Sequence, residues 1–216
     1  MINILYEDNH LLVVEKPINM PVQKDSSLDM DLLTLLKNYL KDKYQKPGNV
    51  YLGLVHRLDR PVGGVMVFAK TSKCASRLGD QVRNRNLKKT YYAIVEGHID
   101  CCGTFRDRLL KNRDTNIVSV SKDGKEAILD YELLSYKDNL SLVKINLRTG
   151  RSHQIRVQFA YHGYPLYGDQ RYNNHSIKGE QIALFAKILE FDHPVTKERL
   201  KFELNLPDRY PFNLFS

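Results

Sequence analysis

The stretch that most constrains the fold is AILDYELLSYKDNLSLVKINL, residues 127–147. Two runs rich in aliphatic and aromatic residues, Ala127–Tyr136 and Leu140–Leu147, flank the polar residues Lys137-Asp138-Asn139. Strand-like runs on either side of a short polar turn are typical of a β-hairpin, whose two strands are antiparallel. We therefore predict that this segment contributes an antiparallel pair to a sheet.

Further strand-like runs lie on both sides of this hairpin. They are predicted at Ile2–Glu7, Leu11–Glu15, Gly64–Lys70, Thr90–Gly97, Ile182–Phe191 and Leu200–Leu204. Most follow one another in an order that hairpins can connect, which favours an antiparallel-rich sheet over a doubly wound parallel one. The predicted fold class is therefore α+β, with a mixed, mostly antiparallel central sheet flanked by helices.

Three helices are predicted between these strands. The first covers Asp29–Tyr44, where leucines recur at helical spacing. The second begins at Ser72, which can cap it, and the third is capped by Ser152 and ends before Gly163. Because no repeat, low-complexity tract or linker divides the sequence, residues 1–216 are predicted to form a single domain.

The overall composition is that of a globular protein with excess positive charge. Hydrophobic residues make up 42% and charged residues 27% of the chain, and the net charge is +8. No run approaches the roughly 18 apolar residues of a membrane span, and the N-terminus does not resemble a signal sequence. Cys74, Cys101 and Cys102 form no paired framework, which favours a reducing cytoplasm.

Most of the excess charge lies in one segment. Residues 70–91 contain seven basic side chains and one acid, Asp80, so this segment alone has a net charge of +6. The basic residues are Lys70, Lys73, Arg77, Arg83, Arg85, Lys88 and Lys89. Such clustering favours binding to nucleic acid phosphates, although a solvated helix face has the same composition.

A single carboxylate, Asp59, lies between Arg57 and Arg60. Basic neighbours favour the ionised form of a carboxylate. An anionic aspartate in a positively charged setting can attack an electron-poor carbon or stabilise a developing cation. A solvated surface ion pair would show the same pattern, so both interpretations remain open.

A second dense stretch, Arg148–Val157, gathers three arginines, His153 and Gln154 at the start of the third predicted helix. Backbone N–H groups at a helix start favour an anion. A buried Arg156 would need a partner carboxylate, for which Asp59 is a candidate; a structural or solvent-facing arginine is the alternative.

Two adjacent tyrosines, Tyr91 and Tyr92, lie on a predicted strand and therefore point to opposite faces. One of them can stack on an unstacked base, or both can pack as ordinary strand residues. The sequence has no phosphate loop, no dinucleotide-binding fingerprint, and no His-Glu-x-x-His or Cys-x-x-Cys pair. Any reaction is thus predicted to need neither a cofactor nor a metal.

Taken together, these segments resemble the RluA-type pseudouridine synthases. The resemblance follows chain order through Ile4–Pro17, His56–Gly64, Lys89–Ala93, Gly150–Val157 and Gly163–Asp169. It implies the family's catalytic fold with a central cleft. It also implies isomerisation of uridine to pseudouridine within structured RNA, either ribosomal or transfer RNA, without a cofactor.

The resemblance also implies roles for individual residues. Asp59 matches the essential carboxylate, which either adds to the sugar C1′ or the uracil or acts through glycal-type chemistry. Tyr91 matches a tyrosine that packs against the base, and Arg156 matches the arginine that pairs with the catalytic aspartate. Arg57 matches the residue that replaces the flipped-out nucleotide. RNA contacts are further expected from His56, Arg60, Arg77, Arg83, Arg85, Lys88 and Lys89.

This chain departs from the family pattern at the expected rim of the cleft. Arg60–Gly64 reads Arg-Pro-Val-Gly-Gly where relatives commonly have Arg-Thr-Ser-Gly, and Gln158 stands where they often have histidine. Many relatives carry an N-terminal S4 domain, whereas this sequence starts at the catalytic strand pair. Recognition is therefore expected from the cleft, the basic segment and Arg106–Arg113.

Two other functions remain open on the sequence. One is a noncatalytic RNA-binding protein on the same scaffold. The other is a metal-independent nuclease that uses His56 and His153. A monomer without a membrane partner is the default expectation.

Overall fold

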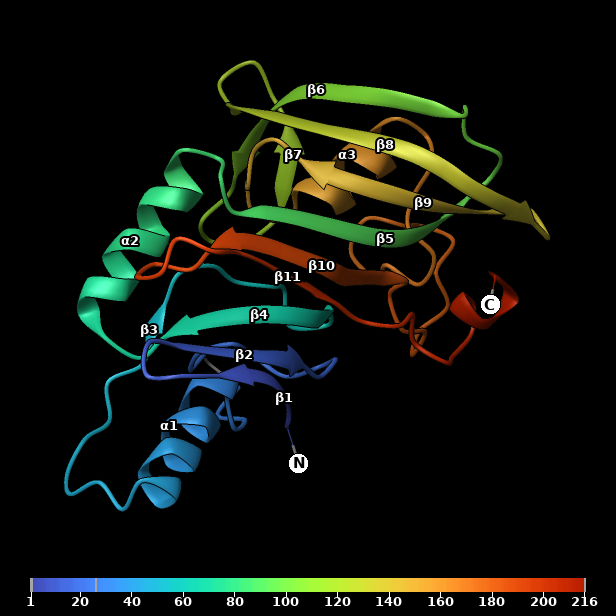
Figure 1. Cartoon of the computed structure of the whole chain (residues 1–216). Helices are drawn as coiled ribbons and strands as arrows, with labels where there is room; N and C mark the ends of the chain where they lie inside the picture. The colour runs from blue at the N-terminus through green and yellow to red at the C-terminus, as the bar shows by residue number, and fades with distance from the viewer. Residues whose placement is uncertain (1, 26, 216) are drawn as a thin grey trace. The chain divides into compact units, whose positions relative to one another are not determined.

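The computed structural model describes residues 2–25 and 27–215, which form two compact units (Figure 1). The first unit consists of Met1–Lys88 and Ile188–Leu204, and the second consists of Lys89–Lys187 and Asn205–Ser216. Whether the two units together make up the predicted single domain depends on how they are joined. The single domain therefore stays a prediction.

The first unit is built on short antiparallel strands. They are β1 (Asn3–Glu7), β2 (Leu11–Lys16), β3 (Gly53–Leu54) and β4 (Gly63–Ala69). β2 pairs with both β1 and β4, and β3 pairs with β4. β2 and β4 form the buried centre because β4 is wholly apolar and the first four residues of β2 are apolar. Late in the chain, β10 (Leu184–Asp192) pairs with β11 (Arg199–Glu203) through Ile188–Asp192.

Two helices belong to the first unit, α1 (Leu32–Lys43) and α2 (Ser72–Arg83). Asp31 caps α1 by accepting a hydrogen bond from the Thr34 backbone N–H at 3.0 Å. The prediction that Ser72 caps α2 is wrong by one residue. Thr71 has an extended backbone and accepts from the Cys74 N–H, so it is the last residue outside the helix.

The second unit contains five antiparallel strands in the order β5-β9-β8-β6-β7. Their bounds are Lys88–Glu96, Leu140–Leu147, Lys125–Lys137, Cys102–Lys111 and Val118–Val120 respectively. The predicted hairpin is confirmed as β8 and β9. Asp138 and Asn139 form its two-residue loop, both with positive φ, as the primed turns of tight hairpins require.

α3 (Gln154–Tyr161) packs on this sheet through Val157, which contacts Leu109, Val118 and Ala127. The prediction that Ser152 caps α3 is wrong. The N-cap position is His153, whose left-handed backbone carries no side-chain cap. The preceding turn is instead closed by the Gln154 side chain, whose Oε1 accepts from the Arg151 N–H and the Thr149 hydroxyl. A short 3₁₀ helix, Phe212–Phe215, follows near the C-terminus.

The observed elements confirm the predicted α+β class, because a mostly antiparallel set of strands is accompanied by three α-helices. Within residues 2–25 and 27–215, no helix is long and apolar enough to cross a membrane.

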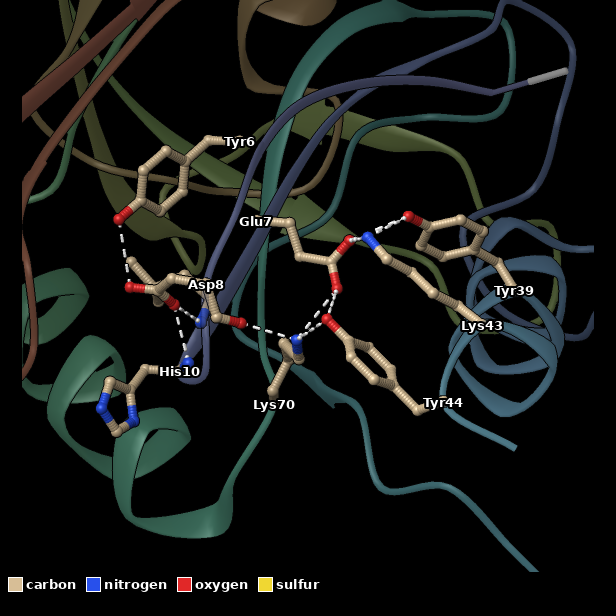
Figure 2. A network of polar contacts seen from close by, with 9 residues as sticks. Tyr6, Glu7, Asp8, His10, Tyr39, Lys43, Tyr44 and Lys70 are labelled. Carbon is tan, nitrogen blue, oxygen red and sulfur yellow. Dashed lines mark hydrogen bonds and ion pairs between the residues drawn. The ribbon is translucent and has the colours of Figure 1, made fainter. Parts of the chain in front are cut away.

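Figure 2 shows a polar network that joins β1 to α1 and to the residue after β4. Its centre is Glu7, whose side chain is 8% exposed. One carboxylate oxygen accepts from Lys43 Nζ at 2.8 Å and the Tyr39 hydroxyl at 2.9 Å. The other accepts from the Tyr44 hydroxyl at 2.6 Å and Lys70 Nζ at 3.0 Å. The carboxylate is therefore fully satisfied as an anion.

This network predicts a specific acid sensitivity. Burial opposes ionisation of Glu7, but the hydrogen bonds from Lys43, Tyr44, Lys70 and Tyr39 outweigh it and lower the pKa to about 2. Because the folded-state pKa is lowered, the stabilisation is present above about pH 4.5 and is lost as the pH falls through 2. At pH 7, Glu7→Gln should lower the free energy of unfolding by about 2 kcal/mol. Urea titrations should show this difference shrinking toward pH 2.5; a constant difference would contradict the assignment.

Candidate active site

Asp59 lies in the loop that connects β3 to β4. Its carbonyl accepts a hydrogen bond from the Val62 N–H at 3.0 Å, which turns the chain into β4. Along this loop His56 and Leu58 are buried, whereas Arg57 and Arg60 are exposed and Asp59 is partly exposed. The two buried side chains thus anchor a loop that presents Arg57 to solvent and leaves Asp59 accessible.

His56 is held by the strand behind the loop. Its Nε2 accepts a hydrogen bond from the Val67 N–H at 3.2 Å, so this nitrogen has no proton. A nitrogen occupied in this way is poorly suited to serve as a nuclease base. The expectation that His56 contacts RNA stays a prediction, and its burial indicates an anchoring role for the loop.

Lys16, the last residue of β2, also holds the loop between β3 and β4 in place. Its side chain is 1% exposed. Its Nζ donates to the carbonyl oxygens of Pro17 at 2.8 Å, Arg60 at 3.0 Å and Val62 at 2.8 Å. Burial lowers its pKa to about 7; the charge of Asp59 opposes this shift and that of Arg60 adds to it. Sequence reasoning placed Lys16 only at a strand end and missed these contacts.

Replacing the amine should loosen the loop. Lys16→Met keeps most of the side-chain volume but leaves three carbonyls without their donor, each of which costs roughly 1–3 kcal/mol when buried. We expect the free energy of unfolding to fall by about 3 kcal/mol in urea titrations. Lys24→Met, at an exposed lysine, is the control and should change stability by less than about 0.5 kcal/mol. Equal effects of the two substitutions would contradict the role of Lys16.

In the second unit, Tyr91 is buried on β5, whereas Tyr92 is partly exposed with Lys187 Nζ 5.2 Å from its ring centroid. The two rings therefore differ in environment, as alternation along a strand predicts. That Tyr91 packs against a uracil stays a prediction.

Arg156 projects from α3 into a buried ion pair. Its Nε donates to Asp169 Oδ2 at 2.8 Å and its Nη2 to Oδ1 at 2.6 Å. The two side chains are 8% and 0% exposed. Asp169 also accepts from the Arg171 N–H, and the Tyr172 ring centroid lies 5.2 Å from the guanidinium. The sequence analysis identified Asp169 only as the last residue of the Gly163–Asp169 segment. It did not identify Asp169 as the partner of Arg156.

The pairing expected between Arg156 and Asp59 remains a prediction, because these residues belong to different units. The two histidines of the nuclease alternative, His56 and His153, are also in different units. His153 Nδ1 lies 2.7 Å from the Tyr172 hydroxyl, so it is already engaged within its own unit.

Lys89 on β5 is a cation without a carboxylate partner in the described part of the chain. Burial lowers the pKa of its amine. A Cβ atom on Gly150 would lie 3.6 Å from Lys89 Nζ, so the missing side chain leaves the amine room for an incoming group. A desolvated, unpaired ammonium favours an anion, and RNA phosphate is such an anion.

The other predicted RNA-binding residues are distributed over the first unit. Arg85, Lys88 and Arg83 are exposed, and Arg83 pairs with Asp80. Arg77 donates to the Pro194 carbonyl at 2.8 Å, which occupies part of its guanidinium. Arg60 is exposed and pairs with Asp29. Their contact with RNA stays a prediction.

No group of three or more histidine, cysteine or acidic side chains among the described residues could hold a metal ion. All three cysteines are free.

Comparison with known proteins gives consistent matches. The sequence profile described as RNA pseudouridylate synthase matches residues 10–161. Ribosomal large subunit pseudouridine synthase C of Vibrio cholerae is 34% identical over 211 residues, covering 94% of this chain and 65% of that protein. The uncharacterized RNA pseudouridine synthase YlyB of Bacillus subtilis is 35% identical over 213 residues, covering 96% and 70%. The chain thus spans about two thirds of the length of these relatives.

Two solved structures share the fold. Human RNA Pseudouridylate Synthase Domain Containing 4 has a TM-score of 0.80, with 95% of this chain and 89% of that chain covered. Human RNA Pseudouridylate Synthase Domain Containing 1 has a TM-score of 0.78, covering 99% and 86%. Each is 23% identical in sequence, so the likeness concerns the fold.

Proposed function

Because this chain belongs to the RNA pseudouridylate synthase family, we propose that it isomerises one or more uridines to pseudouridine in structured RNA. The observation that carries this proposal is the family match over residues 10–161. Relatives named as ribosomal large subunit synthases favour ribosomal RNA as the substrate, with transfer RNA as the alternative. Ribosomal RNA and three free cysteines both suit the cytoplasm.

The proposed reaction needs no external oxidant or reductant. The bond between C1′ and N1 breaks, the uracil turns, and a bond forms between C1′ and C5. The proton on C5 is lost to solvent and N1 gains one, so the product is an isomer of the substrate. Asp59 is the proposed essential carboxylate, either as a nucleophile or as the base and ion partner of a glycal route.

Several features of the described residues support binding of an extruded nucleotide. Chemistry on a base within a helix requires that the nucleotide leave the stack, which costs a few kcal/mol. Arg57 is exposed between two buried anchors, so it is available to enter the vacated position. Lys89 has no carboxylate partner among the residues that the structure describes, and its ammonium is therefore available for a phosphate. These contacts offset the cost of extrusion.

The direct test uses large-subunit ribosomal RNA and transfer RNA labelled with tritium at C5 of uridine. We expect the purified protein to release tritium without an added cofactor and to leave RNA chain length unchanged. RNA cleavage would favour the nuclease alternative, and salt-sensitive binding without tritium release would favour a noncatalytic RNA-binding protein. Comparing pseudouridine maps of total RNA with and without the gene would then identify the modified position.

A further inference from the structure

The C-terminal end of α1 presents an exposed aromatic ring bordered by ammonium groups. Tyr44 is the C-cap residue of α1 and is 45% exposed. Three lysine Nζ atoms lie near its ring centroid: Lys70 at 4.7 Å, Lys43 at 5.6 Å and Lys46 at 5.6 Å. Figure 2 shows the Tyr44 hydroxyl beside Lys70 and pointing toward the Glu7 carboxylate, with Lys43 on the other side of that carboxylate.

The position of the Tyr44 ring is fixed by the network that holds Glu7. The Tyr44 hydroxyl donates to Glu7 at 2.6 Å, and Lys70 Nζ lies 3.4 Å from the same hydroxyl. A ring already anchored at one end loses less conformational entropy when a ligand stacks on it. The exposed part of Tyr44 is therefore a preorganised aromatic surface.

Positive charge remains at this surface after the internal ion pairs are counted. Glu7 is the one carboxylate that pairs with Lys43 and Lys70. Lys41 and Lys46 are exposed and form no ion pair with any described carboxylate. Residues 37–49 contain four lysines and a single acid, Asp42, so the segment has a net charge of +3.

An ordered aromatic face with unneutralised lysines beside it has the composition of a single-stranded nucleic acid contact. Bases stack on aromatic rings with little sequence preference, and lysines bind the neighbouring phosphates. We propose that Tyr44 with Lys43, Lys46 and Lys70 forms a platform that binds an unpaired nucleotide of the substrate; this inference rests on the proposed function, which supplies the RNA partner. This nucleotide is distinct from the uridine that reacts.

The test compares Tyr44→Leu with Tyr44→Phe. Both variants lose the hydrogen bond to Glu7, but only phenylalanine keeps a ring on which a base can stack. The probe is a twelve-nucleotide oligouridylate, measured by fluorescence anisotropy, together with kcat and KM on the labelled RNA. We expect Tyr44→Leu to weaken oligouridylate binding about tenfold, within the roughly five- to 150-fold range of one stacked base. KM should rise with kcat unchanged. Tyr44→Phe should weaken binding by about threefold at most, because it keeps the stacking ring and loses only the hydrogen bond that anchors the ring to Glu7.

Lys46→Gln tests the charge of the platform separately. Loss of one phosphate contact should weaken binding severalfold and reduce the slope of log affinity against log salt by about one. Lys197→Gln, at an exposed lysine of the same unit, is the matched control. The platform is overturned if Tyr44→Leu binds oligouridylate as wild type does, or if Tyr44→Phe weakens binding as much as Tyr44→Leu. Because oligouridylate binding is measured without turnover, its outcome does not depend on whether the protein forms pseudouridine.

Discussion

Asp59→Asn is expected to abolish tritium release from labelled RNA, with a loss on the order of 10³-fold or more, while RNA binding is retained. Asparagine has nearly the same volume as aspartate, but it carries no negative charge and its amide is a poor nucleophile. It can neither add to the sugar or base nor stabilise a developing cation. The β3–β4 loop should persist, because Asp59 contributes its backbone carbonyl to the turn and Lys16 donates to the carbonyls of Arg60 and Val62, none of which the substitution removes.

The matched control is Asp29→Asn. Asp29 is an exposed carboxylate of the same unit that pairs with Arg60, and it has no proposed part in the chemistry. Its substitution should leave kcat unchanged. Activity of Asp59→Asn within about tenfold of wild type would refute the catalytic assignment, even if wild-type protein forms pseudouridine.

Asp169→Asn is expected to produce the largest loss of stability. The substitution removes the buried negative charge to which both Nε and Nη2 of Arg156 donate, and breaking a buried pair in this way typically costs about 3–5 kcal/mol. Asp130→Asn provides the comparison, because Asp130 also accepts two hydrogen bonds from one arginine, Arg148, at 2.6 and 2.8 Å. That pair is exposed, so its loss should cost about 1 kcal/mol or less.

Urea unfolding of both variants measures the contrast. Similar losses from Asp169→Asn and Asp130→Asn would show that burial does not decide the energetics of these pairs. A double variant, Arg156→Met with Asp169→Leu, should recover part of the lost stability, since both charges of this buried pair are then removed.

Local sequence patterns were sufficient to predict the helices and strands whose apolar faces are continuous. The β8–β9 hairpin, α1 and the wholly apolar β4 all carry such faces and were predicted within a few residues. β6 was missed because only Phe105 and Leu109 of its ten residues are buried. Its less exposed positions alternate, but Gly103 and Asp107 among them are not apolar, so the sequence lacks the apolar alternation that identifies strands. Part of it was interpreted only as a basic segment.

The candidate site, too, was predicted only in part from the sequence. The sequence singled out Asp59, Arg57 and Arg156 by residue type and spacing. It gave no sign of Lys16 as the support of the Asp59 loop or of Asp169 as the partner of Arg156. Both contacts join residues whose proximity depends on the fold and whose importance depends on burial. A lysine two residues after the apolar run Leu11–Val14 was the one available signal, because a lysine at a buried strand end needs buried acceptors.

The first unit is made of two segments that are far apart in the sequence, and this affects how the protein folds while it is being synthesised. Ile188–Leu204 completes the first unit, yet it follows ninety-nine residues that belong to the second. A ribosome adding 5–20 residues per second needs roughly 5–20 s to translate that interval. During this time the nascent N-terminal part lacks β11 and most of β10, so chaperone occupancy of stalled nascent chains should persist until residue 204 has emerged.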